Sequence, residues 1–205
     1  MALGFLLKGI LIGLSIAAPV GPIGVLCIRR TLAEGRWAGL ATGLGAATAD
    51  ALYGCLAGFG LAFVTGALMA QRQWLGLAGG VFLCYLGVTT FLAKPAGQPA
   101  SPQPATLGRA YLSAFLLTLT NPMTILSFVA IFAGLGLANA AHSYLAAGVL
   151  VAGVFAGSAL WWLLLSVTVG ILRRRVTGGG LHWINRLSGL LIVGFGLLAL
   201  LQAAL

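Results

Sequence analysis

Long apolar runs constrain the fold of this chain more than any other feature. Each run extends for about 20 residues or more, the length that a helix needs to cross roughly 30 Å of hydrocarbon. Only 6 % of the 205 residues are charged, whereas a soluble domain carries about 25 %. The alternating ten-residue segments of a membrane β-barrel do not occur in the sequence. The sequence therefore predicts an all-α integral membrane protein.

The limits of the apolar runs predict six transmembrane helices. The first run contains Lys8 and is too long for the core of a signal peptide, so we interpret it as the first span. Some runs exceed the length of a single crossing, so we expect tilt or local breaks. The predicted spans are Leu3 to Ile28, Trp37 to Met69, Trp74 to Ala93, Arg109 to Leu137, Tyr144 to Leu172 and Trp183 to Leu205.

A proline-rich stretch separates the third predicted span from the fourth. Residues 94–108 read KPAGQPASPQPATLG, with no apolar periodicity, which is typical of an exposed linker. The linker divides one membrane domain, residues 1–205, into a first half (1–93) and a second half (109–205). Because each half has three spans, the second half enters the membrane upside down relative to the first. Homologous halves would form two inverted three-helix repeats, as in many secondary transporters.

The basic residues gather beside the odd-numbered connections. Cytoplasmic loops carry an excess of Lys and Arg, so the sequence predicts odd loops in the cytoplasm and both termini outside. The net charge of +9 fits loops that contact lipid phosphates, and no soluble basic face is left for nucleic acid. The residues predicted on the cytoplasmic side are Arg29, Arg30, Arg36, Lys94, Arg109, Arg173, Arg174, Arg175 and Arg186, against Lys8 and Arg72 on the other side.

Proline interrupts the first span of each half. PVGPIGV contains Pro19, Gly21 and Pro22, and TNPMTILSF contains Asn121 and Pro122. Packing explains one such break, but breaks at corresponding positions of two halves are the best sequence pointer to a transporter site. The reason is that backbone freed from helix bonding must line a cavity or be buried in protein. We therefore expect broken first helices whose break residues line a pathway.

Asp50 is the strongest candidate for chemistry. Only two acidic residues occur in the chain: Glu34 lies near Arg36 in a predicted loop, and Asp50 lies in the middle of the second span. An uncompensated carboxylate at mid-membrane costs about 2.5 to 3.5 kcal/mol, so such residues are functional candidates by default. Asp50 could carry a proton, bind a substrate ammonium group, or do both in turn. A protonated Asp50 that only joins two helices is the structural alternative, and it stays open.

Several polar or aromatic side chains could face the same cavity. Tyr53 follows Asp50 by three residues and so shares its helix face, whereas Thr48 precedes Asp50 by two residues and so points elsewhere. The second break and the fifth span, the counterpart of the second, supply the others. The further pathway candidates are Tyr53, Thr120, Thr124, Ser127, Ser158 and Trp161, with Trp162 beside them in the sequence.

These features together describe a site for a small zwitterion. Half-helix N-termini present N–H groups and a positive dipole end that suit a carboxylate, and Asp50 suits an ammonium group. The sequence predicts neither a cofactor nor a metal site, because the membrane core holds one acid and no cluster of His and Cys ligands. The three cysteines are interpreted as reduced, buried thiols.

Glycine is abundant, at 31 residues, and small-xxx-small patterns recur along the spans. Such patterns let helix backbones approach closely. The close packing could lie within one protomer or between protomers, so a homo-oligomer stays open. The patterns are Gly35, Gly39 and Gly43; Gly54 and Gly58; Gly76 and Gly80; and Gly153 and Gly157.

The stretches AAPVGPIGVLCIRRTLAEGRWAGLATGLGAATADALYG and LTNPMTILSFVAIFAGLG resemble the lysine exporter family, the LysE/RhtB-type amino-acid exporters of bacteria. The likeness covers nearly the whole chain. It implies export of amino acids or small relatives across the inner membrane, driven by the proton motive force. Many members have a lysine after the NP pair, where this chain has Met123, so the substrate does not transfer from better-known relatives. By motif, the pathway residues would be Pro19, Gly21, Pro22, Asp50, Asn121 and Pro122.

Three other functions compete with amino-acid export. An exporter of metal or other inorganic ions on the same scaffold is the main alternative, although a divalent site usually gathers several acids. A thiol-disulfide carrier needs a cysteine in each half, and the second half has none. An intramembrane hydrolase would need a partner opposite Ser158, and His142 and His182 lie at span ends.

Overall fold

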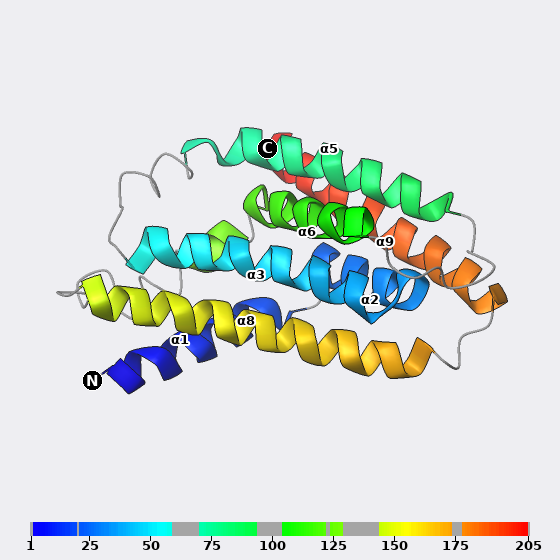
Figure 1. Cartoon of the computed structure of the whole chain (residues 1–205). Coiled ribbons are helices and arrows are strands. Elements are labelled where there is room, and N and C mark those ends of the chain that lie inside the picture. The colour runs from blue at the N-terminus through cyan, green and yellow to red at the C-terminus, as the bar shows by residue number, and fades with distance from the viewer. Residues whose placement is uncertain are drawn as a thin grey trace.

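The computed structural model describes residues 2–19, 21–58, 70–93, 104–121, 124–128, 144–173 and 178–204. Over these ranges the chain is helical apart from short turns (Figure 1). A short helical segment covers residues 124–128. The longer helices are α1 (Ala2–Ala17), α2 (Pro22–Glu34), α3 (Arg36–Gly58), α5 (Arg72–Phe91), α6 (Pro104–Leu119), α8 (Tyr144–Leu172) and α9 (Gly178–Ala204).

Three helices within the described ranges are long and apolar enough to cross a membrane, and they lie in α5, α8 and α9. The pair α1 and α2 passes the same test with an 81° bend between its helices, which makes a fourth span if the pair counts as one. The predicted all-helical membrane fold is confirmed, and the count of six spans stays a prediction. The three apolar stretches are Gln73–Phe91, Tyr144–Leu172 and His182–Ala203.

The helix limits differ from the predicted spans at several places, and two of the differences have a local cause. The first run does not end at Ile28, because α2 continues to Glu34 and stops at Gly35. Gly35 has φ 103°, the left-handed conformation that favours glycine, and its N–H bonds the carbonyl oxygens of Arg30 and Thr31. α6 begins at Pro104, inside the predicted linker, because proline fits the first position of a helix. The far ends of the second and fourth predicted spans lie outside the described ranges.

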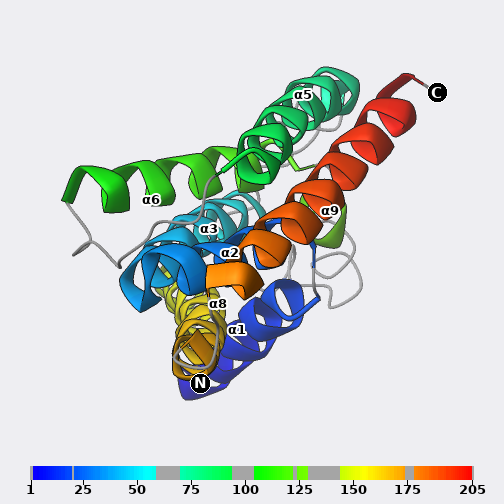
Figure 2. The same cartoon turned by 90° about the vertical axis from the view of Figure 1, so that its right-hand side faces the viewer.

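The helices pack in a consistent set of pairs. α1 lies against α8, α3 lies against both α8 and α6, and α5 lies against α9. α2 contacts α3, α8 and α9 and so lies at the centre. Figure 2 shows the α5–α9 pair on one side and the α1–α8 pair on the other, with α2 and α3 between them. The broken helix α1–α2 therefore reaches from one pair to the middle of the molecule.

Glycine determines how closely α1 approaches α8. A Cβ atom built on Gly9 or Gly13 would collide with the backbone oxygen of Leu150 or Val154. On the facing helix, a Cβ atom on Gly157 would collide with the oxygen of Ile10, and one on Gly153 would lie 2.5 Å from that of Leu6. The close packing predicted from the Gly153 and Gly157 pattern is confirmed for this helix pair within one chain.

Arginines join the helices at one end of the molecule. Arg30 is only 9 % exposed, and it donates to Thr42 Oγ1, the Ala110 oxygen and Ser113 Oγ, which connects α2 to α3 and α6. The prediction that Arg29 and Arg30 lie in a loop is wrong, because α2 extends past both of them. Their guanidinium groups have enough donors to satisfy buried carbonyl and hydroxyl oxygens.

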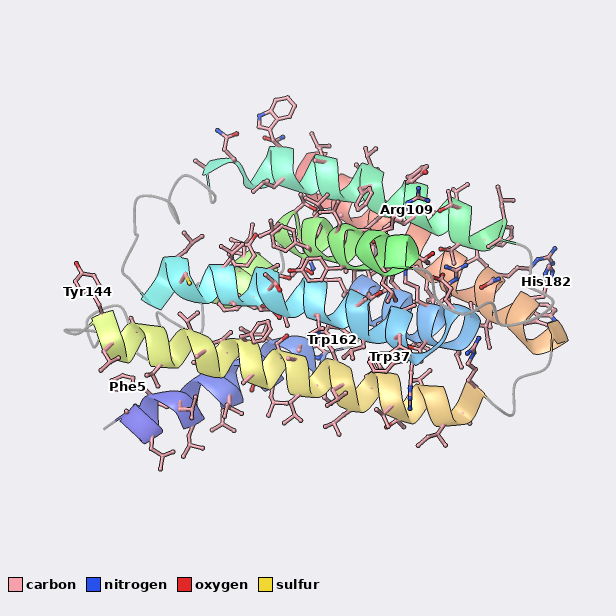
Figure 3. The ribbon with its side chains drawn as sticks, in the orientation of Figure 1. Phe5, Trp37, Arg109, Tyr144, Trp162 and His182 are labelled. Carbon is pink, nitrogen blue, oxygen red and sulfur yellow. The ribbon has the colours of Figure 1, made fainter. Side chains whose placement is uncertain are left out.

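Two further arginine contacts close the same end. Arg29 Nε donates to Asn185 Oδ1 of α9, and Arg29 also pairs with Glu34 at 3.1 Å. Arg173, after α8, donates to the oxygen of Leu32 at 2.9 Å. Figure 3 places Arg109 and His182 at this end and Phe5 and Tyr144 at the opposite end. The basic residues of the described ranges that the sequence assigned to one side of the membrane therefore lie at one end of the molecule.

Candidate functional site

The first helix break lies between α1 and α2. α1 ends at Ala17, and α2 begins at Pro22, which has no N–H and a φ suited to the first helical position. Gly21 precedes it in an extended conformation, and its oxygen accepts the N–H of Val25 at 3.1 Å. The N–H groups of Ile23 and Gly24 have no carbonyl partner inside α2. The break therefore presents the N-terminal end of a helix.

A second break follows α6. That helix ends at Leu119, and the Asn121 oxygen accepts the N–H groups of Thr124 at 3.1 Å and Ile125 at 3.3 Å, which starts the next helical segment. Tyr53 of α3 donates its hydroxyl to the Leu119 oxygen at 2.6 Å, which satisfies a carbonyl left over at the end of α6. The second break thus presents a helix N-terminus as the first does.

Asp50 lies in the buried interface between α3 and α8. Its side chain is 3 % exposed. Ser158 Oγ donates to Asp50 Oδ2 at 2.7 Å, and Trp162 Nε1 donates to Ser158 Oγ at 3.2 Å. Trp162 comes from α8 and lies toward α3 in Figure 3. Ser158 of α8 therefore holds one oxygen of the carboxyl group of α3, and Trp162 of the same helix holds Ser158.

An inner cavity of about 70 Å³ joins Asp50 to both breaks. Its wall includes the N-terminal turn of α2, the side chain of Asp50, and Asn121 and Thr124 of the second break. This places two helix N-termini and one carboxyl group around the same small space. The lining residues are Ile16, Ala17, Pro19, Gly21, Pro22, Ile23, Gly24, Ala46, Asp50, Thr118, Asn121, Thr124 and Trp162.

An outer cavity of about 500 Å³ lies beside the inner one. This volume is within the range of small-molecule sites. Leu83 of α5 and Phe195, Leu198, Ala199 and Gln202 of α9 supply one wall, and the two breaks supply the other. The residues that line both cavities are Ile16, Pro19, Gly21, Pro22, Asn121 and Thr124.

The predicted pathway residues separate into three groups. Pro19, Gly21, Pro22, Asp50, Asn121 and Thr124 line the inner cavity, and Ser127 lines the outer one. Ser158 lies behind Asp50, and Tyr53 supports the end of α6. Thr120 Oγ1 bonds the Leu116 oxygen of its own helix, and Trp161 packs into the apolar core. Pro122 lies outside the described residues.

Several residues that line the cavities are absent from the predicted pathway, among them Trp162, Thr118 and Gln202. Trp162 lines the inner cavity, whereas the predicted pathway residue was its neighbour Trp161. The spacing could have identified it, because Trp162 follows Ser158 by four residues and so shares its helix face. Thr118 also lines the cavity, although its hydroxyl bonds the Ala114 oxygen of its own helix. Among the described residues, no group of three His, Cys, Asp or Glu side chains could hold a metal ion.

Comparison with known proteins gives one family. The family model described as "LysE type translocator" matches residues 14–203 of this chain. The chain is 30 % identical over 195 residues to "Putative amino acid efflux protein YcgF" of Bacillus subtilis (strain 168), which covers 93 % of this chain and 92 % of that protein. It is 29 % identical over 174 residues to "Uncharacterized membrane protein YahN" of Escherichia coli (strain K12), with 83 % and 77 % covered. No solved structure matches the chain significantly.

The family match confirms the resemblance drawn from the PxGP, Asp50 and NP motifs, and it covers both breaks and both cavities. The protein is a multi-pass membrane transporter and not an enzyme. The chain belongs to the LysE type translocator family.

Proposed function

We propose that this transporter exports amino acids or closely related small zwitterions from the cytoplasm by proton antiport. The observation that carries the proposal is the meeting of Asp50 and both helix breaks at one cavity. The name of the Bacillus subtilis relative, an amino acid efflux protein, supports the same substrate class. The exported molecule, protons and membrane lipids are then the partners of the chain.

The geometry suits the two charges of a zwitterion. The N-terminal end of α2 faces the inner cavity, where the N–H groups of Ile23 and Gly24 and the helix dipole favour a carboxylate, and Asn121 and Thr124 of the second break line the same cavity. Asp50 offers an anion for the ammonium group at the same wall. The outer cavity beside them has apolar walls, from Leu83 and Phe195 among others, that would take a side chain.

Asp50 would couple efflux to proton movement by binding a proton and the substrate ammonium group in turn. A buried carboxylate binds either a proton or an ammonium group well, because both remove the cost of a bare charge in a low dielectric. A proton entering from outside would therefore release the substrate, and a substrate arriving from the cytoplasm would release the proton. This exchange is proton antiport.

Six spans in two inverted repeats are part of the proposal. The helix pairs support it, because the pairing stays the same when the halves are exchanged. α1, first in its half, packs on α8, second in the other half, and α6 packs on α3 in the same manner. The pairs α3–α8 and α5–α9 each join corresponding helices. A two-fold axis in the membrane plane requires such reciprocal contacts.

The end of the molecule where Arg29, Arg30 and Arg173 join the helices is called the arginine end. We place the arginine end in the cytoplasm and both termini outside. The outer cavity lies far from that end, since Gln202 follows Asn185 on α9 by a distance of about 25 Å at 1.5 Å per residue. In this arrangement the described conformation is open toward the outside and closed by arginine contacts toward the cytoplasm.

A labelling experiment tests this orientation. An impermeant maleimide added to spheroplasts should label a cysteine appended after Leu205 and should leave Arg109→Cys unlabelled until the membrane is permeabilised. The unmodified chain, with Cys27, Cys55 and Cys84, gives the background. Labelling of Arg109→Cys from outside, with protection of the appended cysteine, would reverse the orientation.

An efflux screen tests the function itself. Cells that produce the chain are challenged with toxic levels of amino acids, dipeptides, amino-acid analogues and divalent metal salts. We expect resistance to at least one amino acid or close analogue, with faster efflux of the same compound from preloaded cells. Resistance to the metal salts alone would replace the proposal with inorganic-ion export.

A further inference from the structure

We propose that Trp162 is a positioning residue for Asp50: its indole N–H directs the Ser158 hydroxyl so that Ser158 donates to one oxygen of the Asp50 carboxyl group. The inference rests on the proposed function, because it concerns the group to which that function gives the proton and the ammonium ion. It adds a residue that acts through Ser158 rather than by contact with the transported molecule.

The three side chains form a buried chain of hydrogen bonds. Trp162 Nε1 lies 3.2 Å from Ser158 Oγ, which lies 2.7 Å from Asp50 Oδ2. The exposed fractions are 4 % for Trp162, 0 % for Ser158 and 3 % for Asp50. Bulk water therefore has little access to these bonds, and each group depends on its protein partner.

The chemistry of the three groups fixes the direction of the chain. An indole N–H can only donate, whereas a serine hydroxyl has one proton to donate and lone pairs to accept. Because Ser158 accepts from Trp162, its own proton is free to point at Asp50 Oδ2. The other oxygen, Oδ1, is then the better place for a proton or an ammonium group.

Ser158 behaves differently from four threonines within the described helices. A serine or threonine in a membrane helix commonly donates to the carbonyl four residues earlier. Ser158 instead donates across the interface to α3. The threonines that follow the common pattern are Thr31, Thr42, Thr48 and Thr118.

The other titratable and charged side chains of the surrounding helices have different partners. On α3, Tyr53 lies one turn from Asp50 and donates to the Leu119 oxygen. Arg36 and Cys55 also lie on α3, and Tyr144 begins α8, whereas the other groups lie on α1, α2 and α6. Lys8 lies over the Phe5 ring, Arg29 contacts Asn185 and Glu34, Arg30 reaches Ala110, Cys27 contacts Ser166, and Tyr111 donates to Thr48. Ser158 is thus the hydrogen-bond donor to Asp50 that the described residues provide.

Infrared titration of the purified full chain in lipid tests the proposal without any substrate. The carboxyl band of protonated Asp50 is followed against pH, and Asp50→Asn identifies it. The assignment is simple, because Glu34 is the only other acidic side chain in the sequence. The variants are Ser158→Ala, Trp162→Phe and the double variant, with Trp37→Phe as the control on the exposed face of α3.

We expect Ser158→Ala to move the midpoint of the titration upward by about one to two pH units. A hydrogen bond to an ionised group contributes about 1.5 to 3 kcal/mol, and one pH unit corresponds to about 1.4 kcal/mol. Trp162→Phe should move the midpoint in the same direction by a smaller amount, because Ser158 is then free to turn and to accept a hydrogen bond from protonated Asp50, which stabilises the protonated form. Trp37→Phe should leave the midpoint unchanged.

The double variant separates a positioning role from a packing role. If Trp162 acts through Ser158, Trp162→Phe should cause no further shift in a Ser158→Ala background. An equal shift in both backgrounds, or no shift in either, would contradict the proposal. If Trp162→Phe does not fold, Ser158→Cys keeps the volume but donates weakly, so its midpoint should lie between those of the unmodified chain and Ser158→Ala. A midpoint equal to that of the unmodified chain would again contradict the proposal.

Failure of this proposal can be told apart from failure of the proposed function. A shifted midpoint in a protein that fails the efflux screen would leave the hydrogen-bond chain in place and remove amino-acid export. Export that persists with an unshifted midpoint would do the reverse.

Discussion

We expect Asp50→Asn to reduce export to the background of cells that lack the protein, while the amount of protein in the membrane stays normal. Asparagine keeps the size of the side chain but can neither release a proton nor pair with an ammonium group. Removing one partner of a buried charge pair costs about 2 to 5 kcal/mol, which corresponds to a loss of roughly 30-fold or more. Efflux from preloaded cells measures the loss.

The matched control for this variant is Glu34→Gln, the same change at the other acidic residue of the chain. Glu34 pairs with Arg29 at the arginine end, and it is 31 % exposed. Because Glu34 lines neither cavity, export by Glu34→Gln should stay close to normal. Export by Asp50→Asn at the level of Glu34→Gln would contradict a transport role for Asp50 and favour the structural alternative.

The second large effect is expected at the interface of α1 and α8. Gly13→Leu should sharply lower the amount of folded protein in the membrane, because even a Cβ atom at this position collides with the Val154 oxygen and lies 2.8 Å from the Ser158 nitrogen. Backbone atoms cannot move aside as the end of a flexible side chain can, so α1 and α8 must separate. Overpacking a well-packed interface costs about 1 to 3 kcal/mol or more.

Two glycines provide controls for the same substitution. Gly4 on α1 and Gly148 on α8 have nothing within 4 Å of an added Cβ atom. Gly4→Leu and Gly148→Leu should therefore keep a normal amount of protein and a normal unfolding temperature. Thermal unfolding followed by size-exclusion chromatography compares the three variants. A Gly13→Leu protein as stable as the controls would mean that α1 and α8 do not approach as closely as described.

The helix breaks were predictable from sequence because their causes are local. Pro22 lacks an N–H and therefore cannot continue α1, but it fits the first position of a helix, so α2 begins there. Asn121 is a residue type that commonly precedes a helix, and its carbonyl accepts the first N–H groups of segment 124–128. Asp50 was predictable for a different reason, because a charge within an apolar run is costly anywhere in a membrane.

The contacts between helices could not be predicted in the same way. The spacing puts Ser158 and Trp162 on one face of α8, but only the rotation of α8 against α3 decides that this face meets Asp50. Arg30 was interpreted as a loop residue because the first apolar run was taken to end at Ile28. Its burial depends on α6, whose Ala110 oxygen and Ser113 hydroxyl are about 80 residues away in the sequence.

The cavities are also a property of the assembled molecule. Their walls come from α1, α2, α3, α6, α8 and α9, with one side chain from α5. The sequence predicts that each break lines a cavity, but the sharing of one cavity by both breaks and Asp50 depends on how the helices cross. The position of Gly35, where α2 stops, is local, yet the length of α2 beyond Ile28 also depends on its packing against α3 and α9.

Proton movement in proteoliposomes tests proton antiport at Asp50 directly. The purified chain is reconstituted with a pH-sensitive dye inside the vesicles, and an outward gradient of the amino acid found in the efflux screen is imposed without a pH gradient. If Asp50 exchanges amino acid for protons, the vesicle interior becomes acidic as the amino acid leaves, and Asp50→Asn abolishes both movements. Amino-acid efflux with no proton movement in the unmodified protein would contradict proton antiport at Asp50.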